Sequence, residues 1–346
     1  MAWAGFGGTL LRYDMFDIDR EAEEARRLLK CERIYHRGQV VAWDGKEVLT
    51  SLIEKHGGIH IADPARAEAV KRVFAIILWG ELAAWKISAQ LADRLVPLEA
   101  KMAATAQAHD EARHFYVMHE YLRQLGYLPV KLDRGPQALL DLVLETDNLA
   151  YKLLGMQLMI ETLALTIFQT VRELEVEPVL AELMKYYERD EARHVGLGMQ
   201  YLPSMMKEMN RREISAMITF QCRLLFWALW ENKVLEPDFR RLGIDPRDIL
   251  ERGRKKQLVA LDAAFSAAGL SFAGEQNLVV RALNGAIELA FPSAETRDAG
   301  LLAKLGAAWT AFRAREVEVS PEELDLHARH AIRTARGEVA AADGNA

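Results

Sequence analysis

The sequence contains little cysteine, and this excludes several kinds of metal and redox site. Only two cysteines, Cys31 and Cys222, occur among 346 residues. Two thiols cannot supply a disulfide framework, a zinc ribbon or a rubredoxin-like iron site, which draw on larger cysteine sets. Iron–sulfur clusters are excluded for the same reason.

Basic residues are in no excess either. Lys and Arg number 44 against 50 Asp and Glu, so the formal net charge is −6. A nucleic-acid-binding protein is expected to carry a basic domain or stripe, so we expect no nucleic acid partner. The first residues lack the basic start of a secretory signal, and Arg12 interrupts their apolar stretch. We therefore expect a cytoplasmic globular protein.

Proline is scarce as well, with 10 residues, and few segments alternate as strands do. Ala, Leu, Glu, Met, Lys and Arg fill the long stretches, and all favour helices. The chain is therefore predicted to be all-α. Helices are expected at about 66–95, 98–125, 137–173, 179–208, 211–234, 246–266, 275–290, 299–316 and 321–336.

The two ends of the chain are less regular than the middle. Residues 1–65 are predicted to form an N-terminal extension, with a helix near 18–32. The turn-forming pair Asp44-Gly45 indicates a short hairpin. Residues 337–346 are expected to be a flexible tail.

One apolar stretch raises the question of a membrane span. Residues 153–171 hold a single charge, Glu161, and are long enough to cross a bilayer. Residues 73–85 are similarly apolar around Glu81. Because two apolar segments carry a carboxylate at the same relative place, we favour core helices of a large bundle over a span.

A repeated motif carries the chemistry. The pentapeptide Asp-Glu-Ala-Arg-His occurs at 110–114 and again at 190–194. Another glutamate lies 30 residues before each motif glutamate: Glu81 before Glu111, and Glu161 before Glu191.

The spacing of these glutamates predicts where they meet. The midpoint of each pair falls beside Pro97 or just before Pro178, so each pair flanks a turn between two helices. About 15 residues of helix then place both glutamates roughly 22 Å from the turn. Glu and His three residues apart share a helix face. Two packed hairpins would therefore gather four glutamates and two histidines at one depth.

Charge then favours a metal site. Four carboxylates in an apolar interior repel one another and lose hydration, which two metal cations would offset. Carboxylates with imidazoles suit iron or manganese. One glutamate from each of two helices and Glu-x-x-His from each of two others is the di-iron bundle pattern.

Over roughly residues 66–208, the sequence resembles the ferritin-like, ribonucleotide-reductase-like di-iron carboxylate superfamily. It is most similar to the oxygenase branch, whose second motif often reads Asp-Glu-x-Arg-His. The resemblance implies a ferritin-like four-helix bundle with additional N- and C-terminal helices, those of 209–336 packed on the bundle. It implies two iron ions, with a manganese–iron pair as the alternative. The implied metal ligands are Glu81, Glu111, His114, Glu161, Glu191 and His194.

The resemblance also assigns roles to the other motif residues. It implies that Asp110 orients His194 and that Asp190 orients His114 across the bundle, with Arg113 and Arg193 beside them. The alternative is ordinary Asp–Arg pairs on a solvated helix face.

Departures from known branches leave the activity unassigned. Met118 stands where ribonucleotide reductases have a radical tyrosine, and Tyr187 where arylamine oxygenases have a further histidine. Leu165 replaces the threonine of hydrocarbon monooxygenases. The resemblance therefore implies only an oxidase or oxygenase that uses O2 on a small organic, predominantly apolar substrate. Electrons are expected from a ferredoxin or flavin reductase, because the chain has no flavin or nicotinamide motif.

Several alternatives and details stay open. Iron storage or detoxification in the ferritin manner and a di-manganese or peroxide-consuming protein are the other functions considered. An aromatic run over 220–230 packs in the core or forms a homodimer face. His327 and His330 have no matching carboxylates, so a third metal site is not favoured. Residues one turn from the ligands are expected to line a pocket: Trp85, Gln107, Gln157, Leu165 and Tyr187.

Overall fold

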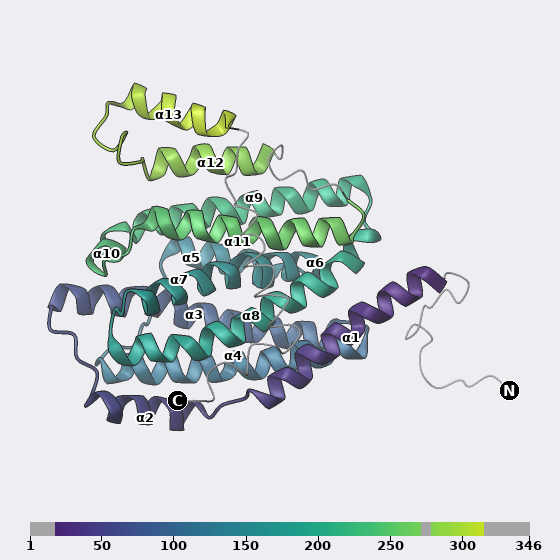
Figure 1. The fold of residues 1–346 in the computed structure, drawn as a ribbon, viewed down its shortest axis with the longest axis horizontal. Coiled ribbons are helices and arrows are strands. Elements are labelled where there is room, and N and C mark those ends of the chain that lie inside the picture. Colours follow the sequence, from purple (N-terminus) through teal and green to yellow (C-terminus); the bar gives the residue numbers. More distant parts are fainter. Residues whose placement is uncertain (1–17, 271–277, 315–346) are drawn as a thin grey trace, which may run out of the picture.

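The computed structural model describes residues 18–270 and 278–314. Every regular element in these two ranges is a helix, as predicted. Four long helical segments form a bundle of two hairpins (Figure 1). The bundle consists of α3 (Pro64–Arg94), α4 (Leu98–Gln124), η1 with α7 (Leu153–Ile160 and Glu161–Glu173) and α8 (Pro178–Lys207).

The predicted prolines do mark the two hairpin turns. Pro97 directly precedes α4, and Pro178 is the first residue of α8, a position where its missing N–H costs nothing. Glu177 caps α8, because its carboxylate accepts hydrogen bonds from the backbone N–H groups of Val179 and Leu180. Both turns therefore lie where the glutamate spacing predicts them.

The prediction of one helix over 137–173 is wrong. The chain instead forms α5 (Arg134–Glu145), a break, then α6 (Leu149–Lys152), which continues into η1. The break falls at the polar residues 146–148, where the Asn148 side chain accepts hydrogen bonds from the N–H groups of Ala150 and Tyr151. Asn competes for backbone groups in this way, and it therefore favours a helix start over a helix interior.

The predicted hairpin at Asp44-Gly45 is also wrong. Asp44 is the N-cap of α2 (Gly45–His56), and its carboxylate accepts a hydrogen bond from the N–H of Glu47. Glycine is required at position 45 because a Cβ there would lie 2.5 Å from Val117 Cγ2 of α4. The Asp44-Gly45 pair therefore marks the start of a helix that packs closely on the bundle, and not a turn between two strands. The preceding helix, α1 (Ile18–Val40), is longer than predicted.

Outer helices cover the bundle on two opposite sides (Figure 1). On one side α1 and α2 pack on α4 and α8. On the other side α5 packs against α9, and α11 packs against α7 and α8. Beyond them, α12 contacts α9 and pairs with α13. The outer helices not yet bounded are α9 (Arg211–Val234), α10 (Glu236–Arg241), α11 (Pro246–Ala267), α12 (Leu278–Ala290) and α13 (Leu301–Arg313).

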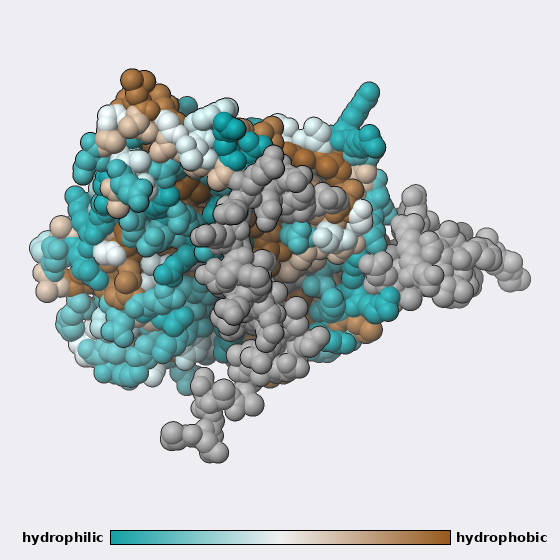
Figure 2. Space-filling view, turned by 45° about the horizontal axis from the view of Figure 1, so that its top comes forward, coloured by the Kyte–Doolittle hydropathy of each residue, from teal (hydrophilic) through white to brown (hydrophobic). Residues whose placement is uncertain are grey.

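Parts of the predicted C-terminal region lie outside the described residues. These are the predicted helix 321–336 with His327 and His330, and the tail 337–346. Within the aromatic run, Phe220 is buried in the core, whereas Phe226 and Trp230 are about half exposed. Figure 2 shows further hydrophobic side chains at the upper edge of the molecule, where α13 lies. Leu301, Leu302 and Trp309 of α13 are among the exposed ones.

The core of the bundle is divided into two apolar clusters. On α3, Phe74 and Leu78 belong to one cluster, and Ile87 and Leu91 to the other. Glu81 lies between them, and the three other bundle segments change cluster at the same depth. A buried polar layer therefore crosses the bundle near its middle.

The apolar segment that raised the question of a membrane span is part of this core. The continuous helix Leu149–Glu173 is the one helix in the described residues that is long and apolar enough to cross a membrane. Of its most apolar window, 67% is buried within the protein, and its carboxylate Glu161 lies in the polar layer.

Candidate metal centre

All six predicted metal ligands lie in the buried polar layer. Each bundle segment contributes: Glu81 from α3, Glu111 and His114 from α4, Glu161 from α7, and Glu191 and His194 from α8. None of the six is more than 5% exposed.

The six side chains form two overlapping groups. Glu81, Glu111, His114 and Glu191 make one, and Glu111, Glu161, Glu191 and His194 make the other. In each group the candidate ligand atoms lie within 4.8 Å of one another. Glu111 and Glu191 belong to both groups, so each of them could provide a ligand to two metal ions.

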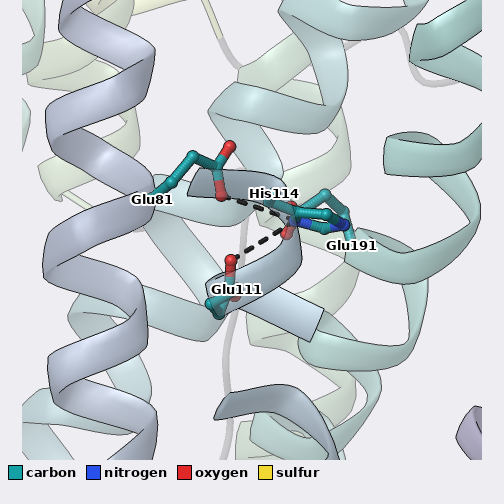
Figure 3. Close-up of side chains that lie close together, drawn as sticks. All are labelled: Glu81, Glu111, His114 and Glu191. Carbon is teal, nitrogen blue, oxygen red and sulfur yellow. Dashed lines mark ion pairs between the residues drawn. The ribbon is translucent and has the colours of Figure 1, made fainter. Parts of the chain in front are cut away.

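The first group surrounds His114, as Figure 3 shows. His114 Nδ1 lies 3.4 Å from Glu81 Oε2, 3.4 Å from Glu111 Oε2 and 3.2 Å from Glu191 Oε1. The three carboxylates therefore converge on one side of the imidazole.

The second group repeats this geometry around His194. Its Nδ1 lies 3.0 Å from Glu111 Oε1, 3.1 Å from Glu191 Oε2 and 3.8 Å from Glu161 Oε2. Glu111 and Glu191 thus each present one oxygen to each histidine. The approximate twofold relation follows from the repeated motif.

Burial dominates the electrostatics of the two unshared glutamates. It raises the pKa of Glu81 well above the ordinary range, and the charges of Glu111 and Glu191 add to the rise, although His114 opposes it. Burial likewise raises the pKa of Glu161, together with Glu191, Glu111 and Glu81. Each of these carboxylates needs positive charge beside it to ionise.

The histidines have the opposite balance. Burial alone would lower the pKa of His114 and His194, but the surrounding carboxylates outweigh it and raise both pKa values well above the ordinary range. Burial would raise the pKa of Glu111, but His194 and His114 outweigh it and lower that pKa. The carboxylates and the imidazoles of the cluster therefore stabilise each other's charged forms.

The donor set fits two divalent metal ions. Glu111 Oε2, His114 Nδ1 and Glu161 Oε2 are buried and make no hydrogen bond within the described structure. These are the atoms that a metal ion would use, since carboxylate oxygens with imidazole nitrogens are the ligands of iron and manganese in such bundles. The cluster is compatible with a di-iron site.

The motif aspartates contact the histidines across the bundle. His114 Nε2 lies 3.3 Å from Asp190 Oδ2, and His194 Nε2 lies 3.4 Å from Asp110 Oδ2. Each imidazole therefore faces a carboxylate with Nε2 while its Nδ1 faces the glutamates. A partner of this kind fixes the tautomer and the ring orientation of a ligating histidine.

Two arginines complete this network. Arg113 donates to Asp190 at 3.0 Å and also to Asp110. Arg193 donates to Asp110 at 2.7 Å and pairs with Asp190 at 2.8 Å. All four side chains are buried, so this network does not lie on a solvated helix face.

Sequence reasoning missed Trp43, which lies between α1 and α2. Its Nε1 donates to Asp190 Oδ2 at 2.7 Å, and the guanidinium of Arg113 lies 4.8 Å from the ring centroid. No sequence signal indicates this role, because Trp43 is far from the motifs and belongs to no repeat.

An apolar cavity of about 110 Å³ reaches the cluster. Glu81, Glu111, Glu161 and Glu191 form part of its wall. The rest is almost entirely apolar, with contributions from α3, α5, η1, α7, α9 and α10 that include Ile77, Ala84, Leu139, Ile160, Ala164 and Phe239.

The five predicted pocket residues do not line this cavity. Gln107 donates to Glu161 Oε1 at 2.6 Å, and Tyr187 stacks on His114 and donates to its carbonyl oxygen. Gln157 is fully buried beside Gly198 of α8. Trp85 is 39% exposed, and Leu165 is half-buried on α7.

The reason is a matter of helix faces. The cavity lies beside α3 and α7, on the side covered by α5 and α9, and Ala84 and Ala164 line it three residues after Glu81 and Glu161. A residue four positions from a ligand lies about 40° past one full helical turn, whereas a residue three positions away lies about 60° short of it. The predicted pocket residues, four positions from the ligands, therefore face another direction than Ala84 and Ala164. The spacing alone could not tell which side of the ligands would remain open.

Comparison with known proteins supports the fold. No protein-family model matches the chain, and no curated protein matches it significantly. Among solved structures, it is similar to "Protein 19 with aldehyde deformylating oxidase activity" from Synechococcus, with a TM-score of 0.50 and 22% sequence identity. The match covers 59% of this chain and 92% of that one. The chain has a ferritin-like bundle fold with added helices.

Proposed function

We propose that the protein is an O2-dependent di-iron oxidoreductase that acts on a small, predominantly apolar organic molecule. One observation carries the proposal: the four glutamates of the two overlapping Glu/His groups form part of the wall of a predominantly apolar cavity. A storage protein needs a metal cluster but has no need of an apolar cavity at it. The oxidase activity in the name of the similar Synechococcus protein also supports an oxidoreductase.

The residues divide the work in a definite way. Glu81 and His114 would hold one iron ion, Glu161 and His194 the other, and Glu111 and Glu191 would contribute to both sites. When bound, two Fe(II) ions supply the electrons that O2 needs to react with an organic molecule. A manganese–iron pair would use the same ligands.

The protein itself supplies orientation and exclusion of water. Asp190 and Asp110 hold the imidazoles from behind, so that Nδ1 of each stays directed at the glutamates. Among the described residues that line the cavity, the polar side chains are the cluster carboxylates, Glu231 and Asn232. An apolar molecule is favoured there because its burial removes hydrophobic surface from water.

The electron balance requires a partner. If one oxygen atom enters the substrate and the other leaves as water, two electrons and two protons must come from outside. The sequence has two cysteines, too few to bind an iron–sulfur cluster, and it has no flavin-binding or nicotinamide-binding motif. A ferredoxin or flavin reductase is the proposed donor.

Oxygen uptake tests this proposal. Protein loaded anaerobically with Fe(II) should consume O2 repeatedly when a chemical or enzymatic reductant and an apolar substrate are present. Glu81→Ala should abolish the repeated uptake, because it opens one ion site and disturbs the charge balance. Glu173→Ala is the matched control, since Glu173 is an exposed residue of α7 paired with Arg252. Uptake limited to one oxidation of the loaded iron, in all variants, would contradict an enzyme and favour storage.

A further inference from the structure

The apolar cavity has a second polar position, on a helix that contributes no ligand to the metal centre. Glu231 and Asn232, at the end of α9, also line it. Helix α9 lies outside the bundle and packs chiefly on α5. The charged groups that act on Glu231 are Asp133 and Arg72, and no glutamate of the cluster is among them.

This position contains buried acceptors without donors. Glu231 is 7% exposed and Asn232 is 4% exposed. The two carboxylate oxygens of Glu231 and the amide oxygen of Asn232 have no hydrogen-bond partner in the described structure. The Asn232 amide is oriented, because its Nδ2 donates to the carbonyl oxygen of Ala228 at 2.8 Å. Three acceptor atoms are therefore left for a ligand.

Nearby cationic side chains in the described structure make no hydrogen bond to these three acceptor atoms. The guanidinium of Arg72 is bound to Asp133 and Asp238, each at 2.9 Å. Burial raises the pKa of Glu231 to about 7, Asp133 adds to the rise and Arg72 opposes it. An unpaired buried carboxylate of this kind is costly, and a cation with N–H donors would offset the cost.

Helix α5 approaches the Glu231 carboxylate closely at Gly135. A Cβ at Gly135, the second residue of α5, would lie 2.5 Å from Glu231 Oε2 and 3.1 Å from Trp230 Cδ1. Glycine at this position therefore lets α5 approach the carboxylate without displacing it. The acceptor group is thus positioned by two helices that also form the cavity wall.

We propose that this cavity binds a small alkyl amine, with its ammonium group at Glu231 and Asn232 and its apolar chain along the cavity. A primary ammonium has three N–H donors and one positive charge, which match three acceptors and one carboxylate. An aldehyde or a carboxylate head group offers no N–H donor, and an alcohol offers a single donor. The inference names the substrate class of the proposed oxidoreductase, and it rests on that function only for the claim that the bound amine is oxidised.

The test compares three probes of equal chain length on the full-length, iron-loaded protein without O2. Calorimetry with n-hexylamine, 1-hexanol and hexanoate should give the highest affinity for the amine, by roughly 10- to 100-fold over the alcohol, because a hydrogen bond to a charged group is stronger than one between neutral groups. This comparison uses the unaltered chain, so it does not depend on whether a variant folds. Equal affinity for amine and alcohol, or tighter binding of hexanoate, would overturn the amine site.

Variants then locate the site. Glu231→Gln keeps the shape and should lower the amine affinity by roughly 10- to 100-fold, while the hexanol affinity changes less than about 3-fold. Glu236→Gln is the matched control: it removes one negative charge five residues further along, where the carboxylate pairs with Lys233 and Arg240 instead of lining the cavity. An equal loss in both variants would show a general charge effect and reject the assignment to Glu231.

The two proposals fail in different ways. Tight amine binding that depends on Glu231, with no repeated O2 uptake, would contradict the oxidoreductase and leave the amine site standing. Repeated O2 uptake with hexanol as readily as with hexylamine, and without an effect of Glu231→Gln, would support the oxidoreductase and overturn the amine site.

Discussion

Asp190 is the most heavily used acceptor around the metal centre. Its Oδ2 accepts from Trp43 and Arg113 and faces His114, while its Oδ1 pairs with Arg193. Burial would raise the pKa of Asp190, but these partners outweigh it and lower that pKa well below its ordinary value. The carboxylate is therefore ionised and tightly held behind His114.

Asp190→Asn should leave the helical fold intact and weaken metal binding or turnover by roughly 10- to 100-fold, the usual effect of losing such a partner. An amide nitrogen cannot accept the hydrogen bonds that one of the two oxygens receives. Metal affinity by competition with a chelator, with circular dichroism for the fold, is the measurement. Trp43→Phe removes one hydrogen-bond donor and keeps the Asp190 carboxylate, so this variant should lose less metal affinity than Asp190→Asn. Unchanged affinity in Asp190→Asn would return Asp190 to a purely structural role.

Glu231 predicts a pH-dependent stability. Its folded pKa is about 7, raised by burial, whereas an unfolded glutamate has a pKa of about 4.3. Below about pH 4 Glu231 is predominantly protonated in both the folded and the unfolded state, so its burial lowers the unfolding free energy little. Between these two values the unfolded state loses its proton first, so the folded state loses stability as the pH rises.

Measured against Glu231→Gln, the unaltered protein should therefore lose on the order of 1–3 kcal/mol of unfolding free energy between about pH 5 and about pH 8. Urea denaturation at both pH values measures this. In Glu236 the hydrogen bonds from Lys233 and Arg240 outweigh burial and lower the pKa, so Glu236→Gln should not reproduce the effect. A pH-independent difference for Glu231→Gln would contradict the unpaired carboxylate.

At the scale of residues, repetition decided what could be predicted. The six candidate ligands follow from two copies of one motif and one spacing, and the structure places them together. Gln107 and Tyr187 were named as pocket residues, but they contact the cluster itself. Glu231 and Trp43 lie outside the repeat, and only tertiary packing brings them to their places.

At the scale of elements, α8 and η1 approach each other unusually closely. A Cβ on Gly198 would lie 2.8 Å from Gln157 Cβ and 2.9 Å from Leu158 Cδ2, whereas a Cβ on Gly196 would meet nothing closer than Ile34 Cδ1 at 3.5 Å. The widened turns of η1 end at Glu161, whose N–H donates to Met156 O, five residues back. π-helical segments frequently occur at functional sites.

Gly198→Ala should destabilise the fold by roughly 1–3 kcal/mol, because the added methyl forces η1 away from α8. Gly196→Ala, two residues earlier on the same helix, should be neutral or stabilise by up to about 1 kcal/mol through helix propensity. Thermal unfolding of both variants is the measurement. Similar effects of the two substitutions would contradict the close approach of η1 and α8.

Helix starts and turns explain which elements were predicted. Pro97 and Pro178 define the hairpins because proline restricts the chain locally. The start of α2 was missed because Asp suits a turn and a helix cap equally well. The break before Leu149 was missed because the predicted helix placed Asn148 in its interior, whereas Asn favours a helix start. The π-helical register of η1 has no local signature in the sequence; close packing on α8 accompanies it.

At the scale of the whole molecule, added helices distinguish this chain from a minimal bundle. α5, α9 and α10 contribute to the wall of the cavity that reaches the cluster, so the C-terminal region contributes to the site. The sequence predicted α9 at 211–234, but it joined α5 to the following bundle segment and did not predict α10. It could not indicate which face of the bundle these helices would cover.

Assembly size separates an enzyme from a storage cage. Ferritin-like storage needs a cage of about 24 subunits, whereas an enzyme with its cavity inside one chain does not. We expect a monomer or small oligomer on a calibrated sizing column with light scattering. Elution as a cage-sized particle would favour storage.

The central claim is that six side chains of the buried layer hold two metal ions. The most direct test is metal analysis after anaerobic reconstitution with Fe(II), followed by removal of loosely bound metal. We predict about two iron ions, or one iron and one manganese, per chain, since six ligands of this kind divide between two ions. A stoichiometry near one, or zinc retained in preference to iron, would contradict the account.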